Sequence, residues 1–178
     1  MADAETRREA RLFSLARSVI TGWALLGGVV TLAVVVVQTA SVVTGIFGAP
    51  VPGDFELTEL GIAVAVFAFL PYCQLTDANV TADIFTSGLG KRTQSALVLL
   101  SSVIALVFAI LMAWRTWLGA ENQFDYDYQT AILQIPIGYA FIAIVISLIL
   151  VAVAAIITIV ESYQGVVTRS QNVITDGP

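Results

Sequence analysis

Charged residues are absent from four long stretches of the chain. No Asp, Glu, Lys or Arg lies in residues 18–53, 60–76, 93–114 or 128–160. Each stretch is apolar and is close to or above the roughly 20 residues that a helix needs to cross a bilayer. Unbroken apolar runs such as residues 32–37 do not alternate as the strands of a membrane barrel do. The pattern predicts an all-α integral membrane protein with four transmembrane helices.

Turn-forming residues and charges set the limits of the predicted spans. We expect a single membrane domain over residues 1–178, with spans at about 19–44, 55–76, 94–118 and 131–160. The first span ends at a Gly and Pro cluster between Gly45 and Gly53, which cannot continue a helix. Residues 161–178 are polar, contain two glycines and are expected to form a loose tail.

Two segments outside the spans are expected to lie on the membrane surface. Residues 1–18 hold four of the eight basic residues, with Leu12, Leu15 and Val19 at helical spacing, which is typical of an amphipathic lead-in at the headgroups. A frayed basic tail is the alternative. A cleaved signal peptide fits less well, because the apolar run that follows is longer than the usual 7–15 residues. A second short in-plane helix is expected after the second span, in residues 77–90.

The basic residues predict the orientation of the spans. Every Lys and Arg except Arg115 falls at the termini or in the connection between the second and third spans. The positive-inside rule then places both termini in the cytoplasm. Trp114 and Trp117 lie near the outer end of the third span, as expected for an aromatic belt.

Composition narrows the chemistry that the chain can perform. It is 58% hydrophobic and 12% charged, contains no His and one Cys, and has a formal net charge of −5. These counts exclude His-ligated metals, an internal disulfide and an iron–sulfur cluster, and they disfavour nucleic acid as a partner. We expect no enzymatic activity, no metal site and no cofactor in this chain.

Small residues recur at helical spacing in two spans. The second span carries Gly61, Ala65 and Ala68, and the third carries Ser101, Ala105, Ala109 and Ala113. Small residues in register allow close helix approach in membranes. The two stripes predict either packing within this chain or packing against a different membrane subunit.

Charges at the edges of the spans are the other candidates for function. Glu59 near the start of the second span and Arg115 near the end of the third both fall at the outer surface. They either form an ion pair or stay separately solvated at the headgroups. No charge lies near the middle of a span, where ion-coupled carriers keep their ion or proton groups. The residues therefore favour a structural or scaffolding membrane subunit.

The order of these features resembles the small membrane subunit, the Q subunit, of tripartite ATP-independent periplasmic (TRAP) transporters, over about residues 19–160. Acidic residues open the second span, here Glu56 and Glu59, and a motif ending in Asp follows it, here Asn79-Val80-Thr81-Ala82-Asp83 before Lys91 and Arg92. The last span opens with Pro136-Ile137-Gly138-Tyr139. The chain departs from the family pattern at Asn79, where His is common, and in the separation of the two acids.

The resemblance implies a role and a set of partners. A Q subunit is a scaffold beside a large permease subunit of the bacterial inner membrane. That permease moves its substrate, commonly a carboxylate, by an elevator motion with a sodium gradient. The coupling sodium is then expected in the partner subunit, and a periplasmic substrate-binding protein delivers the substrate. A non-transporting assembly or anchoring subunit of another complex is the alternative, and membrane lipids are partners in either case.

The acidic outer loop is a candidate docking site for that binding protein. Glu121, Asp125 and Asp127 lie among Phe124, Tyr126 and Tyr128. A mixture of acids and aromatic rings suits a transient contact whose association is steered by charge. An ordinary solvated loop, with its aromatic rings resting at the headgroups, explains the same composition.

Overall fold

The structure is a computed structural model that describes the backbone of residues 2–76 and 91–175, and side chains within residues 13–76 and 97–160. This part of the chain forms the helices α1 (Ala2–Ile46), α2 (Asp54–Leu75), α4 (Lys91–Asp125) and α5 (Gly138–Thr175). All four are long and apolar enough to cross a membrane. The predicted all-α fold with four membrane-spanning helices is confirmed.

Glycine and proline residues explain where α1 ends and where α2 begins. α1 stops before Gly48, which has a φ of 80°, and Pro50 and Pro52 follow within a few residues. α2 starts after Gly53, also left-handed with a φ of 76°, and the Asp54 carboxylate accepts the Phe55 N–H at 2.7 Å. Glycine adopts positive φ without a steric penalty, so it suits both positions. The α1–α2 turn is therefore short and tightly defined.

The helix limits differ from the predicted spans in three places. Residues 2–18 are not a separate surface helix, since α1 runs unbroken from Ala2 to Ile46. Residues 161–175, predicted as a loose tail, extend α5 to Thr175. The fourth helix begins at Gly138 and not near Ala131, because residues 128–137 form a compact loop closed by Thr130 N–H to Ile135 O (3.0 Å) and Ile137 N–H to Tyr128 O (3.1 Å).

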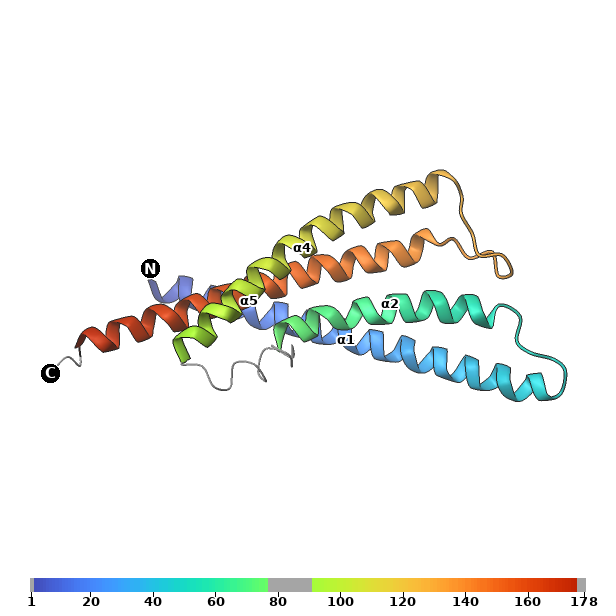
Figure 1. The fold of residues 1–178 in the computed structure, drawn as a ribbon, viewed down its shortest axis with the longest axis horizontal. Coiled ribbons are helices and arrows are strands. Elements are labelled where there is room, and N and C mark those ends of the chain that lie inside the picture. The colour runs from blue at the N-terminus through green and yellow to red at the C-terminus, as the bar shows by residue number, and fades with distance from the viewer. Residues whose placement is uncertain (1, 77–90, 176–178) are drawn as a thin grey trace.

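The helices pack as an open row in the order α1, α2, α5, α4. α4 packs on α5, α5 on α2, and α2 on α1, while α4 has no substantial contact with α1. Figure 1 shows two hairpins, α1–α2 and α4–α5, that lie together near the chain termini and spread apart toward the loops. Near the middle, the Trp23 indole N–H donates to Ser147 Oγ at 2.9 Å and ties α1 to α5.

Burial follows from this open arrangement. A third of the most apolar window of α5 is buried (33%), against 11% for α4. The buried side chains of α5 include Leu148, Ala154 and Ala155. Most large apolar side chains on the other helices are exposed, which for a membrane span means contact with lipid or with another protein. Both termini lie at one end of the molecule, with the two loops at the other, here called the loop end (Figure 1).

Candidate functional site

Glu56 joins the two hairpins at the loop end. Its carboxylate oxygens accept the backbone N–H groups of Ile132 (2.8 Å) and Leu133 (3.0 Å), which lie in the loop between α4 and α5. Hydrogen bonds to a carboxylate are stronger than those between neutral groups. The α4–α5 loop is therefore held against the start of α2 by one side chain, which lies at a position of the Q-subunit pattern.

Two glycines let the α4–α5 loop pack closely. A Cβ on Gly53 would lie 2.5 Å from Leu133 Cγ, and a Cβ on Gly138 would lie 2.6 Å from the Phe124 ring. The Phe124 ring also meets Tyr139 edge-on, at 5.9 Å between centroids. Gly138 thus provides space for Phe124, while the neighbouring Pro136 pairs with Gln129 across the loop. These contacts give a structural reason for the Pro136 and Gly138 positions of the pattern.

A polar cluster that the sequence pattern did not predict ties α1 to α2 at the loop end. The Gln38 amide donates to the Thr58 hydroxyl and to the Asp54 carbonyl oxygen (3.3 Å). Ser41 donates to the Asp54 carboxylate and accepts the Val51 N–H at 3.3 Å. The available signal was the spacing of Gln38 and Ser41, which places both on one face of an otherwise apolar helix.

Glu59 and Arg115 do not form the ion pair that was one of the two alternatives. Both side chains are exposed, and no ion pair joins them in the described part of the chain. The reason lies in the order of the helices, because α5 packs between α2 and α4 and separates the two charges. They stand as separate charges near the loop end.

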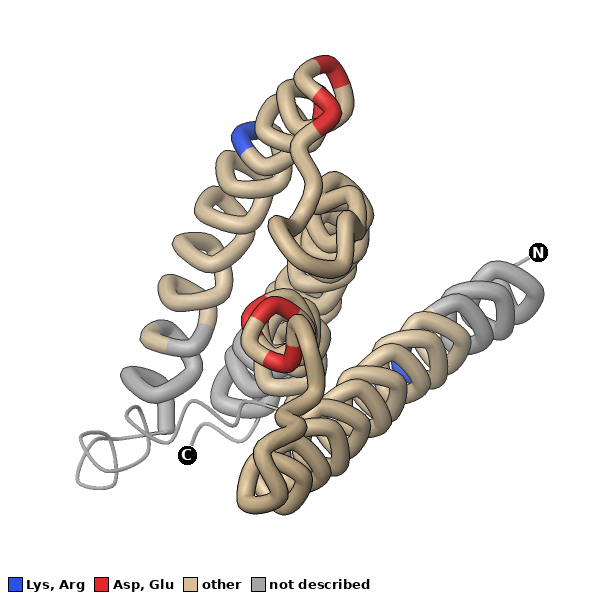
Figure 2. Tube along the Cα trace, turned by 90° about the vertical axis from the view of Figure 1, so that its right-hand side faces the viewer, with Lys and Arg blue, Asp and Glu red and all other residues tan. Residues whose placement is uncertain are grey.

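The acidic residues of the predicted outer loop lie at the tip of α4. Glu121, Asp125 and Asp127 are all exposed, and Asp127 adopts a φ of 49° while accepting a bond from Gln129 Nε2 at 3.2 Å. Figure 2 shows the acidic positions in two groups, at the end of α4 and at the start of α2, on the same end of the molecule. A partner approaching the loop end meets a negatively charged surface with exposed Tyr126 and Tyr128 beside it.

The small residues of α2 pack against α1. A Cβ on Gly27 of α1 would lie 2.8 Å from Ala68 Cβ and 3.4 Å from the Ala65 carbonyl oxygen. A Cβ on Gly61 would lie 2.4 Å from Val34 Cγ2. This stripe therefore serves close packing inside the chain.

The small residues of α4 divide between two environments. Ala109 is 1% exposed, Ala105 and Ala113 are half-buried, and Ser101 is exposed. Large apolar side chains surround the stripe on the exposed side of α4, among them Ile104, Phe108 and Leu111. Only part of this stripe is covered by the chain's own packing. The remaining positions of the Q-subunit pattern, Asn79 and Asp83, lie outside the described residues.

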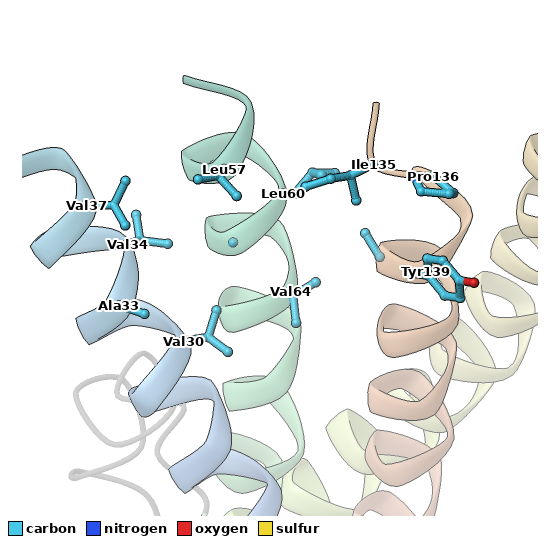
Figure 3. Close-up of a pocket in the computed structure, with 12 residues that line it drawn as sticks. Val30, Ala33, Val34, Val37, Leu57, Leu60, Val64, Ile135, Pro136 and Tyr139 are labelled. Atoms are coloured by element: carbon cyan, nitrogen blue, oxygen red, sulfur yellow. The ribbon is translucent and has the colours of Figure 1, made fainter. Parts of the chain in front are cut away.

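An apolar groove of about 430 Å³ lies among α1, α2 and the start of α5. Figure 3 shows its side chains, with Val30 and Val34 on α1, Leu57 and Leu60 on α2, and Tyr139 on α5. The lining is almost entirely aliphatic, so this groove has no set of polar groups that would hold a polar solute. It can accommodate only an apolar group, such as a lipid chain or an apolar side chain.

Comparison with known proteins identifies the family. A model described as "Tripartite ATP-independent periplasmic transporters, DctQ component" matches residues 33–165. Neither the curated proteins nor the solved structures gave a match. The family match covers most of the chain, including all of α2, the α4–α5 loop and the greater part of the spans. The chain therefore belongs to the DctQ component family of TRAP transporters, the family that its sequence resembles.

Proposed function

We propose that this chain is the scaffold of a TRAP transporter and that it supports a large permease subunit in the bacterial inner membrane. The family match carries this proposal. It agrees with the open row of helices, which leaves extensive apolar surface on α4 for another protein, and with the apolar lining of the groove in Figure 3. In this proposal the sodium coupling, the elevator motion and the recognition of a carboxylate substrate belong to the partner subunit.

The loop end is the proposed contact for the substrate-binding protein. The Glu56 bonds hold the α4–α5 loop in place, and Glu121, Asp125 and Asp127 give that end a negative potential. A rigid, charged surface favours fast and salt-sensitive association with a partner that carries basic groups. The loop would then orient the binding protein over the permease.

Co-purification and reconstitution test the scaffold role. The tagged chain, extracted in mild detergent, is expected to bring a large hydrophobic permease with it. Proteoliposomes that contain both subunits and loaded binding protein should take up substrate when an inward sodium gradient is imposed, and proteoliposomes that contain this chain alone should not. Transport by the chain alone would overturn the scaffold role.

A further inference from the structure

A second cavity, the inner slot, lies over α5 between α2 and α4. Its volume is about 250 Å³, and its lining includes Cys73 and Gln74 from α2, Ala105, Ala109 and Met112 from α4, and Val151 from α5. It is separate from the groove of Figure 3, which involves α1 and the loop end of α2. Cys73 and Gln74 belong to the last turn of α2, so the slot lies toward the terminal end of the molecule.

Gln74 is the residue that gives this slot a chemical preference. Its side chain is 9% exposed, yet no hydrogen bond to its amide exists in the part of the chain that the structure describes. Its amide is not among the fully buried polar atoms without a partner in that part of the chain, so part of it stays accessible at the slot. Inside a membrane an accessible amide without a partner is costly, because hydrocarbon replaces none of the hydrogen bonds that water would make. An occupant of the slot therefore satisfies Gln74 only if it also forms a hydrogen bond with the amide.

The surroundings of Gln74 favour a helix as that occupant. Ala105 and Ala109 line the slot with small side chains, and small residues allow the backbone of a neighbouring helix to approach closely. Ile104 and Phe108 continue the apolar surface outward along α4, the helix that the chain's own packing covers least. A lipid acyl chain would fill the slot but leave the amide unpaired. A helix bearing Ser, Thr, Asn or Gln satisfies both requirements.

We propose that the inner slot receives a transmembrane helix of the large permease subunit and that a hydrogen-bonding side chain on that helix pairs with the Gln74 amide. This inference rests on the proposed function and adds the position and the chemistry of the subunit contact. In this contact, apolar side chains of the permease helix fill the slot. The hydrogen bond to Gln74 sets the register of the two subunits.

The single cysteine of the chain provides a direct probe of the slot. Cys73 is partly exposed and lines the cavity beside Gln74, so a small maleimide is expected to label it in the purified chain. In the complex with the large subunit, labelling should be lost. Labelling after denaturation verifies that the thiol is still reduced, and a Cys73→Ala chain reports any reaction elsewhere.

The outcomes separate this inference from the proposed function. If the large subunit co-purifies and Cys73 is labelled as fast as in the isolated chain, the slot is not the contact, while the scaffold role stands. If no large subunit is recovered under any condition, the scaffold role fails and the slot proposal fails with it. Protection of Cys73 by lipid vesicles alone, with no further change on adding the permease, would also overturn the proposal in favour of a lipid.

Substitution of Gln74 tests the hydrogen bond itself. Gln74→Leu should leave the melting temperature of the isolated chain unchanged or raised, and should weaken association with the large subunit about threefold to tenfold, as expected for one interhelical hydrogen bond. Gln38→Leu is the matched control, because that glutamine is paired inside the chain and its loss should lower the melting temperature without changing association. Unchanged association for Gln74→Leu would remove the amide from the contact.

Discussion

Single side chains near the ends of helices fasten the two hairpins together at the loop end. Glu56 is the clearest case, because its two oxygens accept two backbone N–H groups that lie more than 70 residues away in the sequence. The loop that contains these donors has Gln134 at a φ of 53°, a conformation that non-glycine residues seldom adopt. The hydrogen bonds to Glu56 help to hold the loop in this shape.

Glu56→Gln is expected to loosen the α4–α5 loop. The amide keeps one acceptor oxygen but turns an NH₂ group toward the second N–H donor, so one of the two bonds is lost. We expect a lower melting temperature in detergent and faster proteolysis within residues 126–137, with a larger effect for Glu56→Ala. Glu59→Gln is the control, since Glu59 is exposed on the same helix. Equal behaviour of the Glu56 and Glu59 variants would contradict this role.

Two buried serines should respond to the same substitution in opposite directions. Ser102 is 1% exposed, and its hydroxyl has no partner in the described part of the chain, whereas Ser147 is equally buried and accepts the Trp23 bond. Ser102→Ala should keep or raise the unfolding free energy, while Ser147→Ala should lower it by about 1 kcal/mol. Thermal or denaturant unfolding of the two variants in one detergent measures the difference. If Ser102→Ala lowered the unfolding free energy as much as Ser147→Ala, Ser102 would form a hydrogen bond that this structure does not contain.

At the scale of the helices, close packing depends on which side of each helix carries the small residues. Gly27 and Gly28 are neighbours in α1, but a Cβ on Gly27 would strike Ala68, whereas a Cβ on Gly28 would meet nothing within 4 Å. The two positions share the same local helix preference. They differ only in tertiary contact.

Alanine at these two positions should therefore give opposite results. Gly27→Ala should separate α1 from α2 and cost about 1–3 kcal/mol of stability, as overpacking does. Gly28→Ala should stabilise the chain by about 0.5–1 kcal/mol, because alanine loses less backbone entropy in a helix. The free energy of unfolding of the isolated chain is the appropriate measurement. A similar loss of stability in both variants would mean that the contact between α1 and α2 does not limit stability.

The small-residue stripe of α4 should separate folding from assembly. Ala109 is buried inside the chain, so Ala109→Leu should lower the stability of the isolated chain by about 1–3 kcal/mol. Ala105 is half-buried and lines the inner slot, so Ala105→Leu should fold normally and reduce recovery of the large subunit. Melting temperature and co-purification are measured on each variant. Normal folding and full recovery for both would show that the stripe packs against neither α5 nor a partner.

At the scale of the whole molecule, the open row of helices puts the acidic residues of two hairpins on one end (Figure 2). α5 packs between α2 and α4, so the tip of α4 and the start of α2 lie at the same end of the molecule on opposite sides of α5. Arg115 and Glu59 therefore do not meet. The loop end therefore offers a negative surface, and the apolar faces of the spans remain available to lipid and to the permease subunit proposed above.

Neutralising the acidic residues of the predicted outer loop tests their proposed role in docking. The triple variant Glu121→Gln, Asp125→Asn, Asp127→Asn should reduce uptake when the binding protein is scarce and recover part of it when more is supplied, because charge complementarity mainly raises the association rate. The effect should shrink at high salt, where exposed charges are screened. Glu59→Gln serves as a control at the same end. Unchanged uptake at every binding-protein concentration, even at low ionic strength, would leave the loop as a membrane-surface cap.

The sequence by itself determined the membrane class, the number of spans and the family. These properties depend on local quantities: the length of each uncharged run, the distance that a helix covers per residue, and short motifs such as Pro136 to Tyr139. The family match and the four helices confirm them. Helix limits were harder to predict, because residues 131–135, all apolar except Gln134, fit a span equally well but their backbone bonds close the α4–α5 loop.

Only the tertiary structure decided which surfaces meet. Stripe spacing alone could not assign the α2 small residues to α1, since the same spacing serves any close helix contact. The separation of Glu59 from Arg115 follows from the position of α5 between their helices, which no local pattern encodes. The bonds of Glu56 to the distant loop and the unpaired amide of Gln74 have the same origin. Each depends on which helices become neighbours, and that choice is made by the packing of the whole chain.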